Sequence, residues 1–417
     1  MKISFSSYTG LTAQILALVA LQGGASAQTL NDVHPQGLFN TPQPGIDAPL
    51  TRTPADATSL KDHFHLSASA GVRYEDNIFL TSTNEKSDVI TTISATLRFV
   101  SAEDGAAENT FSVAYSPSYS MYASDSDSNN LGHALTFTLG KEMPKTSIRF
   151  NLSYSKSSGS NRFVSGIVDH GSLNAGLSIS HLLTGKTSLN LGFGYGFDNF
   201  GNGALFDNNS YNVRLGLRYQ ATGKISVGPY VSYRNTDLSD GGGSFDQAVY
   251  GYGVSATYRV TGKTTLTGSI GGSTNSFSDS GSGSDESALT WSIGANHQIS
   301  EKTSIRASFY RNYKASYTFE DAGYLATGLA LSATHTVSDR LSLYATVTYE
   351  NDDYFRATNS SYRLEEDYYS LVLGSNYRFS NGLSVGANAK YQTNDSTQAL
   401  NEFDGLSFGI TASYNFW

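Results

Sequence analysis

The chain has 417 residues, a formal net charge of −9 and no cysteine. The lack of cysteine excludes a disulfide framework, a thiolate metal site and a cysteine nucleophile, and the acidic balance argues against a nucleic-acid partner, which needs a basic footprint. Hydrophobic residues make up only 39% of the chain, whereas 27 Tyr, 22 Phe and 41 Gly are present, a mixture that favours β structure over a helical domain.

Residues 1–27 are predicted to be a secretory signal peptide. Lys2 gives a positively charged start, and the apolar stretch 11–21 is too short to span a bilayer. The sequence ASA at 25–27 fits a cleavage site. The mature chain is therefore expected to begin at Gln28; the alternative is a buried N-terminal helix.

Residues 28–62 are predicted to form an extended, proline-rich periplasmic linker. Five of the eight prolines of the chain fall in this segment, and it shows no apolar periodicity. Such a composition is typical of a linker and not of a folded domain. The alternative is a tail that docks onto a partner.

From residue 63 onward the sequence predicts strand after strand, because apolar residues alternate with small or polar ones. In residues 211–219, for example, Tyr, Val and Leu occupy one face, and Asn, Gly and Arg the other. The strands are expected at 64–74, 88–100, 109–122, 131–141, 147–156, 170–182, 187–198, 209–220, 224–236, 246–260, 264–276, 287–299, 303–315, 323–337, 341–354, 367–379, 383–394 and 404–417.

Pro117 and Pro229 fall within two of these strands. Each removes one hydrogen-bond donor from a ladder, so a bulge or weak pairing is expected at both positions.

Short polar turns alternate with longer acidic loops between the strands. Six of the turns carry a basic residue, and successive basic residues lie 38 to 41 positions apart: Lys145, Lys186, Lys224, Lys263, Lys302 and Arg340. A period near 40 residues also occurs in β-propellers. However, each unit here holds two long strands instead of four short ones, and the Trp-Asp signature is absent.

Three turns contain Gly-Lys, at Gly185, Gly223 and Gly262, and Gly-Lys also ends a phosphate-binding loop. The first glycine of that motif is missing at Ser180 and Thr257, and a strand follows where a helix is required. The sequence therefore predicts hairpin turns in which the three glycines supply a permissive backbone.

These patterns predict an all-β fold over residues 63–417: a transmembrane antiparallel up-and-down β-barrel of about 18 strands (16–20), with short periplasmic turns and longer extracellular loops. Nearly every strand repeats an apolar face at bilayer-spanning length, behind a secretory signal. A lipid-facing apolar band around a polar interior explains both observations.

The stretch GVRYEDNIFLTSTNEKSDVITTISATLRF, residues 71–99, resembles the opening hairpin of the β-barrel porin-2 family of outer-membrane proteins. The matching residues are Gly71, Tyr74, Asp76, Asn77, Ile78, Phe79 and Asp88. The resemblance implies a barrel in the cell outer membrane, encoded in some members with exopolysaccharide export machinery, and it implies no catalytic residue. Asp76 and Asn77 are interpreted as turn residues; the alternative is a cation site.

Basic residues on the polar phase of the strands are predicted to line the pore: Arg73, Arg98, Arg149, Arg214, Arg218, Arg234, Arg259, Arg306, Arg378 and Lys390. Acidic residues are expected mainly in the longer loops, with Glu350 as the main candidate on the lumenal phase. Asp352 and Asp353 are among the residues assigned to a loop. The predicted bore is therefore basic although the chain as a whole is acidic.

A basic bore favours anions. Arg98, Arg218, Arg259 and Arg378 lie just before short turns and are predicted to form a collar near the periplasmic mouth. The expected function is an outer-membrane porin for hydrophilic, anionic solutes or glycans. The alternatives are the outer-membrane port of an exopolysaccharide export system and a plugged structural barrel. The arginines could also pair with carboxylates folded inward and set no selectivity.

No cofactor, metal site or enzymatic activity is expected, since the lumenal phase carries almost no histidine. His181, His297 and His335 lie on the apolar phase and are interpreted as part of an interfacial girdle, with a metal or proton site as the alternative. The expected partners are outer-membrane lipid, lipopolysaccharide and the outer-membrane assembly machinery, with polysaccharide export components as a further candidate. The sequence leaves the oligomeric state open.

Overall fold

The computed structural model describes residues 63–101, 109–201, 205–239, 244–277, 285–318, 323–354 and 364–416. The signal peptide and linker predicted for residues 1–62 lie outside these ranges, as does Trp417. No helix in the described part of the chain is long and apolar enough to cross a membrane.

The described residues form 18 strands, the number that the sequence predicts, and one short 3₁₀ turn, η2, at Ser126–Ser128. The strands are β1 (Phe64–Glu75), β2 (Asp88–Val100), β3 (Asn109–Tyr122), β4 (Asn130–Glu142), β5 (Thr146–Asn161), β6 (Gly166–Leu182), β7 (Thr187–Phe200), β8 (Asp207–Gln220), β9 (Ile225–Ser239), β10 (Ser244–Thr261), β11 (Thr264–Phe277), β12 (Glu286–Ser300), β13 (Thr303–Ala315), β14 (Gly323–Thr336), β15 (Leu341–Tyr354), β16 (Glu365–Arg378), β17 (Leu383–Ser396) and β18 (Phe403–Asn415).

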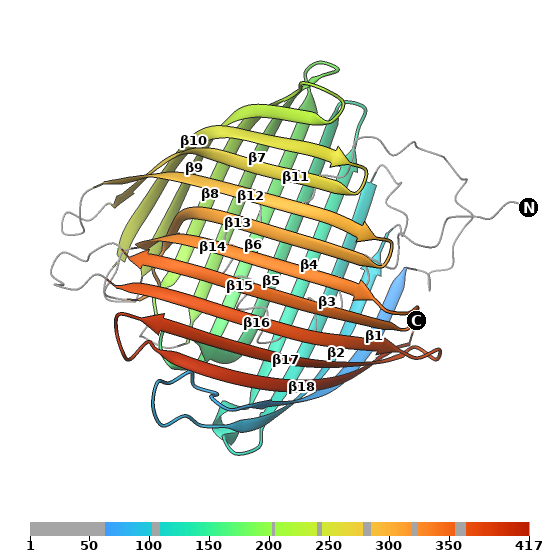
Figure 1. Cartoon of the computed structure of the whole chain (residues 1–417), viewed down its shortest axis with the longest axis vertical. Coiled ribbons are helices and arrows are strands. Elements are labelled where there is room, and N and C mark those ends of the chain that lie inside the picture. The colour runs from blue at the N-terminus through green and yellow to red at the C-terminus, as the bar shows by residue number, and fades with distance from the viewer. Residues whose placement is uncertain are drawn as a thin grey trace, which may run out of the picture.

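Each strand pairs antiparallel with the next, and β1 also pairs with β18, so the sheet closes into a barrel (Figure 1). At the seam, Gly71 lies opposite Thr411. In Figure 1, β10–β18 cross the front of the barrel and the earlier strands form the wall behind them. Closure removes both sheet edges and leaves backbone donors and acceptors paired, which a membrane-spanning sheet requires.

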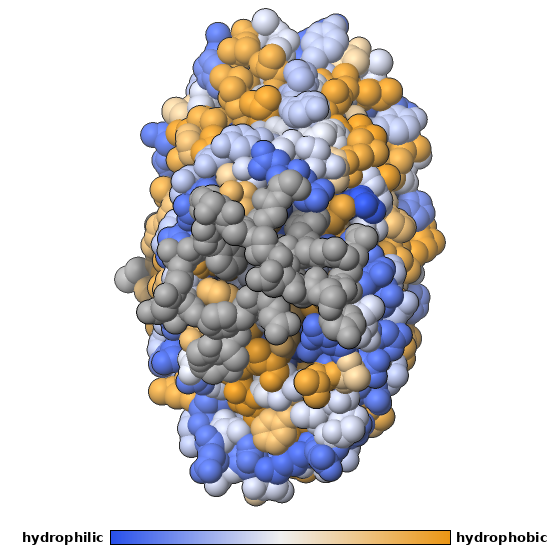
Figure 2. Space-filling view, turned by 90° about the vertical axis from the view of Figure 1, so that its left-hand side faces the viewer, coloured by the Kyte–Doolittle hydropathy of each residue, from blue (hydrophilic) through white to orange (hydrophobic). Residues whose placement is uncertain are grey.

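The two ends of the barrel differ. We call the end with the connections 143–145, 183–186, 221–224, 262–263, 301–302, 337–340 and 379–382 the turn end. The other end, which includes the connections 76–87, 123–129 and 397–402, is the loop end. Figure 2, which looks onto the left-hand side of Figure 1, shows hydrophobic and hydrophilic residues mixed over this face.

The outer surface carries the apolar face of the strands, with aromatic residues at two levels. Near the turn end, ring contacts with centroid distances of 5.0 to 5.9 Å link Phe64, Phe99, Phe111, Phe137 and Phe150 across five neighbouring strands. Near the loop end, Tyr211, Tyr233 and Tyr250 form a similar series. Aromatic belts of this kind lie at the two interfaces of a membrane.

The three Gly-Lys segments are hairpin turns between consecutive strands, as predicted, but the role predicted for their glycines is wrong, and hydroxyl groups stabilise the turns instead. Gly185, Gly223 and Gly262 do not have a positive φ, and an added Cβ there would meet nothing within 4 Å; among the described glycines only Gly382 has a positive φ, of 86°. Instead, the residue two positions before the basic residue accepts hydrogen bonds from turn amides. In the β8–β9 turn, Thr222 Oγ1 accepts from the amides of Lys224 (3.2 Å) and Ile225 (3.0 Å).

The same arrangement recurs at Thr184, Thr261, Ser300 and Ser338. Hydroxyl side chains that bond to the backbone two or three residues further on are a known turn device. In five of the six turns that carry a basic residue, the repeated element is therefore a hydroxyl residue two positions before it; the turn with Lys145 has Met143 there.

We expect Thr222→Ala to lower the free energy of unfolding by about 1 kcal/mol, because two amides lose their acceptor at an exposed turn. Gly223→Ala should be nearly neutral. Urea unfolding in detergent micelles measures both values. A larger loss for Gly223→Ala than for Thr222→Ala would show that the turn depends on the glycine after all.

Two sequence expectations about the strands can be compared with the pairing register. Pairing between β2 and β3 skips the positions around Pro117, and pairing between β8 and β9 skips those around Pro229, which confirms weak pairing at both prolines. The strands predicted at 147–156 and 170–182 are longer than expected, because β5 and β6 remain paired as far as Asn161 and Gly166. The β5–β6 hairpin continues, with mostly polar residues, beyond the point where the alternation of apolar residues ends, and the predicted bounds stop at that point.

Candidate functional site: a charged bore crossed by inward-folded connections

Six arginines lie on the inward phase within a few residues of the turn end. They are spaced two to four strands apart around the whole barrel, and we call this set the arginine ring: Arg98 on β2, Arg149 on β5, Arg218 on β8, Arg259 on β10, Arg306 on β13 and Arg378 on β16. Their inward phase follows from the strand alternation, since neighbours such as Leu97, Leu217 and Tyr377 are exposed on the outside.

The arginine ring has few ionic partners. Arg149 forms an ion pair with Glu142 at 2.6 Å, and both side chains are well exposed. Arg98, Arg306 and Arg378 form no ion pair with any residue in the described ranges. Arg218 and Arg259 lie close enough for their like charges to repel. Positive charge at this level is therefore only partly compensated by the described wall.

The remaining predicted pore residues lie at other levels and in different surroundings. Arg73, near the loop end of β1, pairs with Glu75 at 2.8 Å, and Lys390 lies midway along β17. The guanidinium of Arg214 lies 3.6 Å from the centre of the Tyr230 ring. The structure thus distributes the ten predicted residues along the bore and does not gather them in one cluster.

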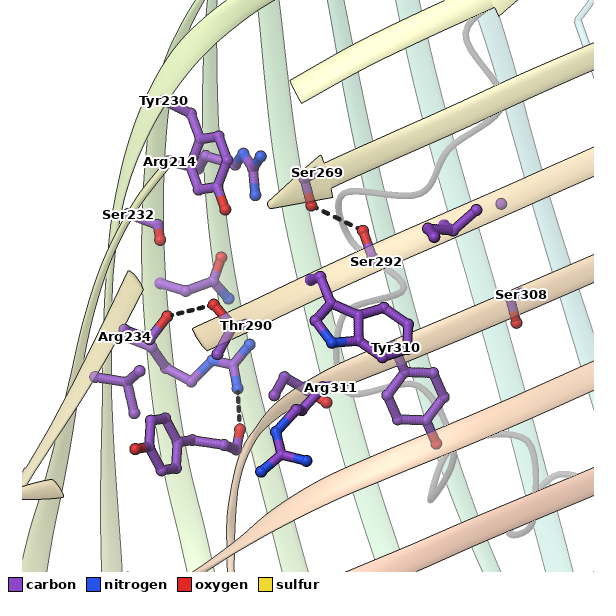
Figure 3. A pocket seen from close by; sticks show the side chains of 18 of the residues that line it. Arg214, Tyr230, Ser232, Arg234, Ser269, Thr290, Ser292, Ser308, Tyr310 and Arg311 are labelled. Atoms are coloured by element: carbon purple, nitrogen blue, oxygen red, sulfur yellow. Dashed lines mark hydrogen bonds between the residues drawn. The ribbon is translucent and has the colours of Figure 1, made fainter. Parts of the chain in front are cut away.

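One cavity in the wall of β8–β13 contains two of these arginines. Arg214 and Arg234 line it together with Tyr230, Ser232 and Ser292 (Figure 3). Arg234 Nη1 lies 3.5 Å from the backbone carbonyl of Tyr313, four strands away along the wall. The cavity therefore lies where the loop end of β13 bends towards β9.

The prediction that Glu350 lies on the lumenal phase is confirmed, whereas the assignment of Asp352 to a loop is wrong. Glu350 and Asp352 are both on β15, and Glu366 is on β16; all three are buried on the inward phase. The error arises because the strands extend beyond the apolar segment. Near the loop end a strand can therefore carry carboxylates on its inner face without placing them in lipid.

These carboxylates belong to a buried ionic cluster that we call the lumenal brace: Arg162, Tyr310, Lys314, Glu350 and Asp352. Arg162 Nη2 donates to Glu350 Oε1 and to Asp352 Oδ2, at 3.0 Å each. Lys314 Nζ donates to Glu350 Oε2 at 2.6 Å, and the Tyr310 hydroxyl donates to the same oxygen. Two cations therefore face two carboxylates, and the charges of the cluster cancel.

The connection between β1 and β2 also folds inward. Asn77 is 3% exposed; its side-chain amide donates to the carbonyls of Thr81 and Asp404, at 2.9 Å each. Asp76 Oδ1 accepts from the amide of Leu406 at 2.7 Å. These contacts support the interpretation of Asp76 and Asn77 as residues of the turn, and they anchor the turn to β18, beside the seam.

Two clusters of buried apolar side chains lie on the inner face of the barrel near the loop end. One cluster joins Ile78 of the β1–β2 connection to Ile90 and Tyr122 on the wall, and a second joins Leu80 to Tyr368 and Phe403. The alternation of the strands gives no indication of them, because Ile78 and Leu80 lie in a connection. The inner face near the loop end therefore carries buried apolar residues beside its charged ones, which the prediction of a polar bore did not include.

A surface ion pair lies at the rim of the loop end. Lys86 Nζ is 2.8 Å from Asp125 Oδ1. Hydrogen bonds from Lys86 and Ser128 hold the pKa of the Asp125 carboxyl below its usual range. This pair links the connections 76–87 and 123–129 and does not cross the bore.

The three histidines interpreted as girdle residues lie near the turn end. Each shares a 2.8 Å hydrogen bond with the threonine that begins the preceding strand: His181 with Thr146, His297 with Thr264, and His335 with Thr303. No group of three or more His, Asp or Glu side chains in the described ranges is arranged to hold a metal ion.

Two family profiles match the sequence. Residues 284–416 match the family described as "Putative beta-barrel porin 2", and residues 144–318 match the Gram-negative porin family. The chain is a porin-like outer-membrane β-barrel. The first family is the one that the opening hairpin resembles, although the matched segment lies at the other end of the chain. Both matched families are porin families, and porins are not enzymes.

Solved outer-membrane proteins are similar to this porin-like barrel at low identity. The FrpB iron transporter from Neisseria meningitidis is 9% identical over 85% of this chain and 81% of that chain, with a TM-score of 0.48. The siderophore receptor PirA from Pseudomonas aeruginosa is 11% identical over 88% and 81%, with a TM-score of 0.44. OccK5 from Pseudomonas aeruginosa is 11% identical over 85% and 99%, with a TM-score of 0.44. No curated protein matches the sequence.

Proposed function

We propose that the porin-like barrel is a channel for hydrophilic solutes that favours anions, with the turn end facing the periplasm. The observation that supports this is the arginine ring. Its six arginines are distributed around the barrel near the turn end, and Arg98, Arg306 and Arg378 form no ion pair with any residue in the described ranges. A ring of basic side chains in a water-filled pore lowers the barrier for anions and raises it for cations.

The preference is expected to arise at the arginine ring and not at the loop end. The carboxylates of the lumenal brace are neutralised by Arg162 and Lys314, so they should neither attract cations nor repel anions strongly. We expect the solutes to be free anions or acidic glycans, because both carry the negative charge that the arginine ring attracts.

A plugged structural barrel is the second candidate. The apolar clusters and the lumenal brace occupy part of the bore near the loop end, and both observations favour this candidate. The two candidates differ in one measurement: single-channel conductance in a planar bilayer, which a channel shows and a plugged barrel does not.

Reversal potentials across a salt gradient measure the predicted anion preference. We expect the wild-type channel to favour chloride over potassium several-fold. The triple variant Arg98→Ser, Arg306→Ser, Arg378→Ser should bring the ratio close to one, because it removes half of the charge of the ring. Arg340→Ser is the matched control, since Arg340 is an exposed turn residue at the same end of the barrel. A wild-type preference for cations that persists in the triple variant would contradict the proposal.

A further inference from the structure

The cavity in the wall of β8–β13 forms where the sheet divides. Pairing between β12 and β13 ends at Trp291 and Arg311, although β12 begins at Glu286. The end of β13 turns inward instead, and there the carbonyl of Tyr313 accepts a hydrogen bond from Arg234 Nη1 at 3.5 Å. The cavity between this end and the wall has a volume of about 110 Å³ (Figure 3). Since one water molecule needs about 10–15 Å³ of such space, the cavity has room for several.

Three half-buried arginines line this cavity, and we call them the arginine pocket: Arg214 on β8, Arg234 on β9 and Arg311 on β13. Among the described residues that line the cavity there is no Asp or Glu. The guanidinium of Arg214 lies against the Tyr230 ring, and Arg311 Nη1 donates to Thr327 Oγ1 at 3.3 Å. Like charges gathered in one cavity repel one another, and a bound anion relieves that repulsion.

Hydroxyl groups from β11 and β12 line the same cavity. Ser269 and Ser292 share a hydrogen bond of 2.8 Å, and so do Ser273 and Thr290. A hydroxyl has one donor and two acceptor positions, so each pair keeps the capacity to bond to a further polar group. The surface around the arginine pocket is therefore suited to a ligand that carries hydroxyl groups.

Two amide oxygens of the cavity residues require a donor. Asn212 Oδ1 and Asn312 Oδ1 are buried and accept no hydrogen bond from any described residue, and Asn312 as a whole is 7% exposed. Buried polar atoms are nearly always hydrogen-bonded, so the donor must come from solvent or from a ligand. An inorganic anion such as chloride has no donor, whereas a sugar hydroxyl does.

We propose that the arginine pocket is a binding site for a sugar that carries a carboxylate. The guanidinium groups hold the carboxylate, because their planar fork matches its two oxygens. The sugar hydroxyls bond to the serine and threonine hydroxyls and donate to the two amide oxygens. This inference rests on the proposed channel function and deepens it: the arginine ring favours anions in general, and the arginine pocket selects acidic sugars among them.

Three small ligands test the proposal on the unmodified protein. Isothermal titration calorimetry of the barrel in detergent micelles would compare glucuronate with glucose, which lacks the carboxylate, and with acetate, which lacks the hydroxyls. We expect glucuronate to bind at least about tenfold more tightly than either, because each of the others leaves one set of hydrogen bonds unmade. Equal affinities for glucuronate and acetate, or for glucuronate and glucose, would overturn the proposal.

Two variants separate the two halves of the site. Arg311→Gln should weaken the binding of glucuronate about tenfold, because a charge-assisted hydrogen bond is lost, and should leave the binding of glucose unchanged. Ser292→Ala should weaken the binding of glucuronate several-fold and leave that of acetate unchanged. The heat-dependent shift in electrophoretic mobility shows that each variant is folded.

Arg340→Gln is the matched control, because it removes the same charge from an exposed turn residue outside the bore. We expect it to bind glucuronate as the wild type does. A loss in Arg340→Gln as large as that in Arg311→Gln would mean that the net charge of the barrel, and not the arginine pocket, attracts the ligand.

Binding in micelles does not require conduction, so this inference and the proposed function can fail separately. A wild type that conducts anions but binds glucuronate no more tightly than acetate leaves the function standing and overturns the arginine pocket. A wild type that binds glucuronate most tightly but shows no conductance supports the arginine pocket and overturns the channel.

Discussion

Replacing Glu350 by alanine is expected to lower the free energy of unfolding by about 3–5 kcal/mol, the usual cost of removing one partner from a buried ion pair. Glu350 is 0% exposed and accepts hydrogen bonds from Arg162, Tyr310 and Lys314. Without it, Arg162 and Lys314 lose a buried carboxylate that they share, in a site with little solvent.

Urea unfolding in detergent micelles, followed by tryptophan fluorescence, measures this effect. Glu142→Ala is the matched control, because Glu142 also pairs with an arginine but its side chain is 50% exposed. An exposed pair contributes about 0–1 kcal/mol. Equal losses in the two variants would mean that water reaches Glu350, and the description of the brace as a buried cluster would then be wrong.

Glu350→Gln separates charge from shape at the same position. The amide keeps the volume and one acceptor but no longer neutralises Arg162 and Lys314. We expect a loss nearly as large as that of Glu350→Ala, since the unpaired cations and not the missing atoms account for most of the cost.

The barrel itself could be predicted from the sequence because its rules are local. In a strand that faces lipid on one side, apolar and polar residues must alternate. In an up-and-down barrel the chain comes back to the same end after every two strands. Alternation and a period near 40 residues are therefore enough to count the strands. At the turns the same local information points to the wrong residues. Gly185, Gly223 and Gly262 are conspicuous residues, but Thr184, Thr222 and Thr261 bond to the turn backbone.

The loop end could not be predicted in the same way, because its contacts join residues far apart in the chain. Nothing in the sequence near Arg162 indicates that it meets Glu350, and the acidic pair Asp352 and Asp353 looks like a solvated loop. One signal was available. Glu350 and Asp352 are two residues apart, so on a strand they share a face, and two buried carboxylates require a cation nearby.

The inward position of the apolar residues Ile78 and Leu80 could not be predicted either, for the same reason. Ile78 and Leu80 lie in a connection, where no periodicity tells the inside from the outside, yet they are 0% and 5% exposed. Their position depends on the anchoring of Asn77 to Asp404, on the far side of the seam. The arginine ring, in contrast, lies on regular strands, and its inward phase could be assigned directly from alternation.

Replacing Gly271 by valine is expected to prevent correct assembly of the β10–β11 hairpin and hence of the barrel. Gly271 on β11 lies opposite Gly253 on β10. A Cβ at Gly271 would lie 2.0 Å from the carbonyl oxygen of Tyr252 and 2.8 Å from the Cα of Gly253. Backbone atoms of two paired strands cannot move aside as a flexible side chain can, so the strands would have to separate and lose ladder hydrogen bonds.

The smaller change Gly271→Ala allows the effect to be graded. Overpacking by one methyl group typically costs about 1–3 kcal/mol, and the branched valine should cost more. The fraction of folded barrel, measured by its heat-dependent shift in electrophoretic mobility after refolding into detergent, should fall from wild type to Gly271→Ala to Gly271→Val. Gly262→Ala is the matched control in the turn of the same hairpin, where an added Cβ would meet no described atom within 4 Å. Equal impairment of folding by Gly262→Ala and Gly271→Ala would contradict this prediction. The close approach of β10 and β11 would then not be the reason for glycine at position 271, and the loss would come from the flexibility of glycine in the hairpin as a whole.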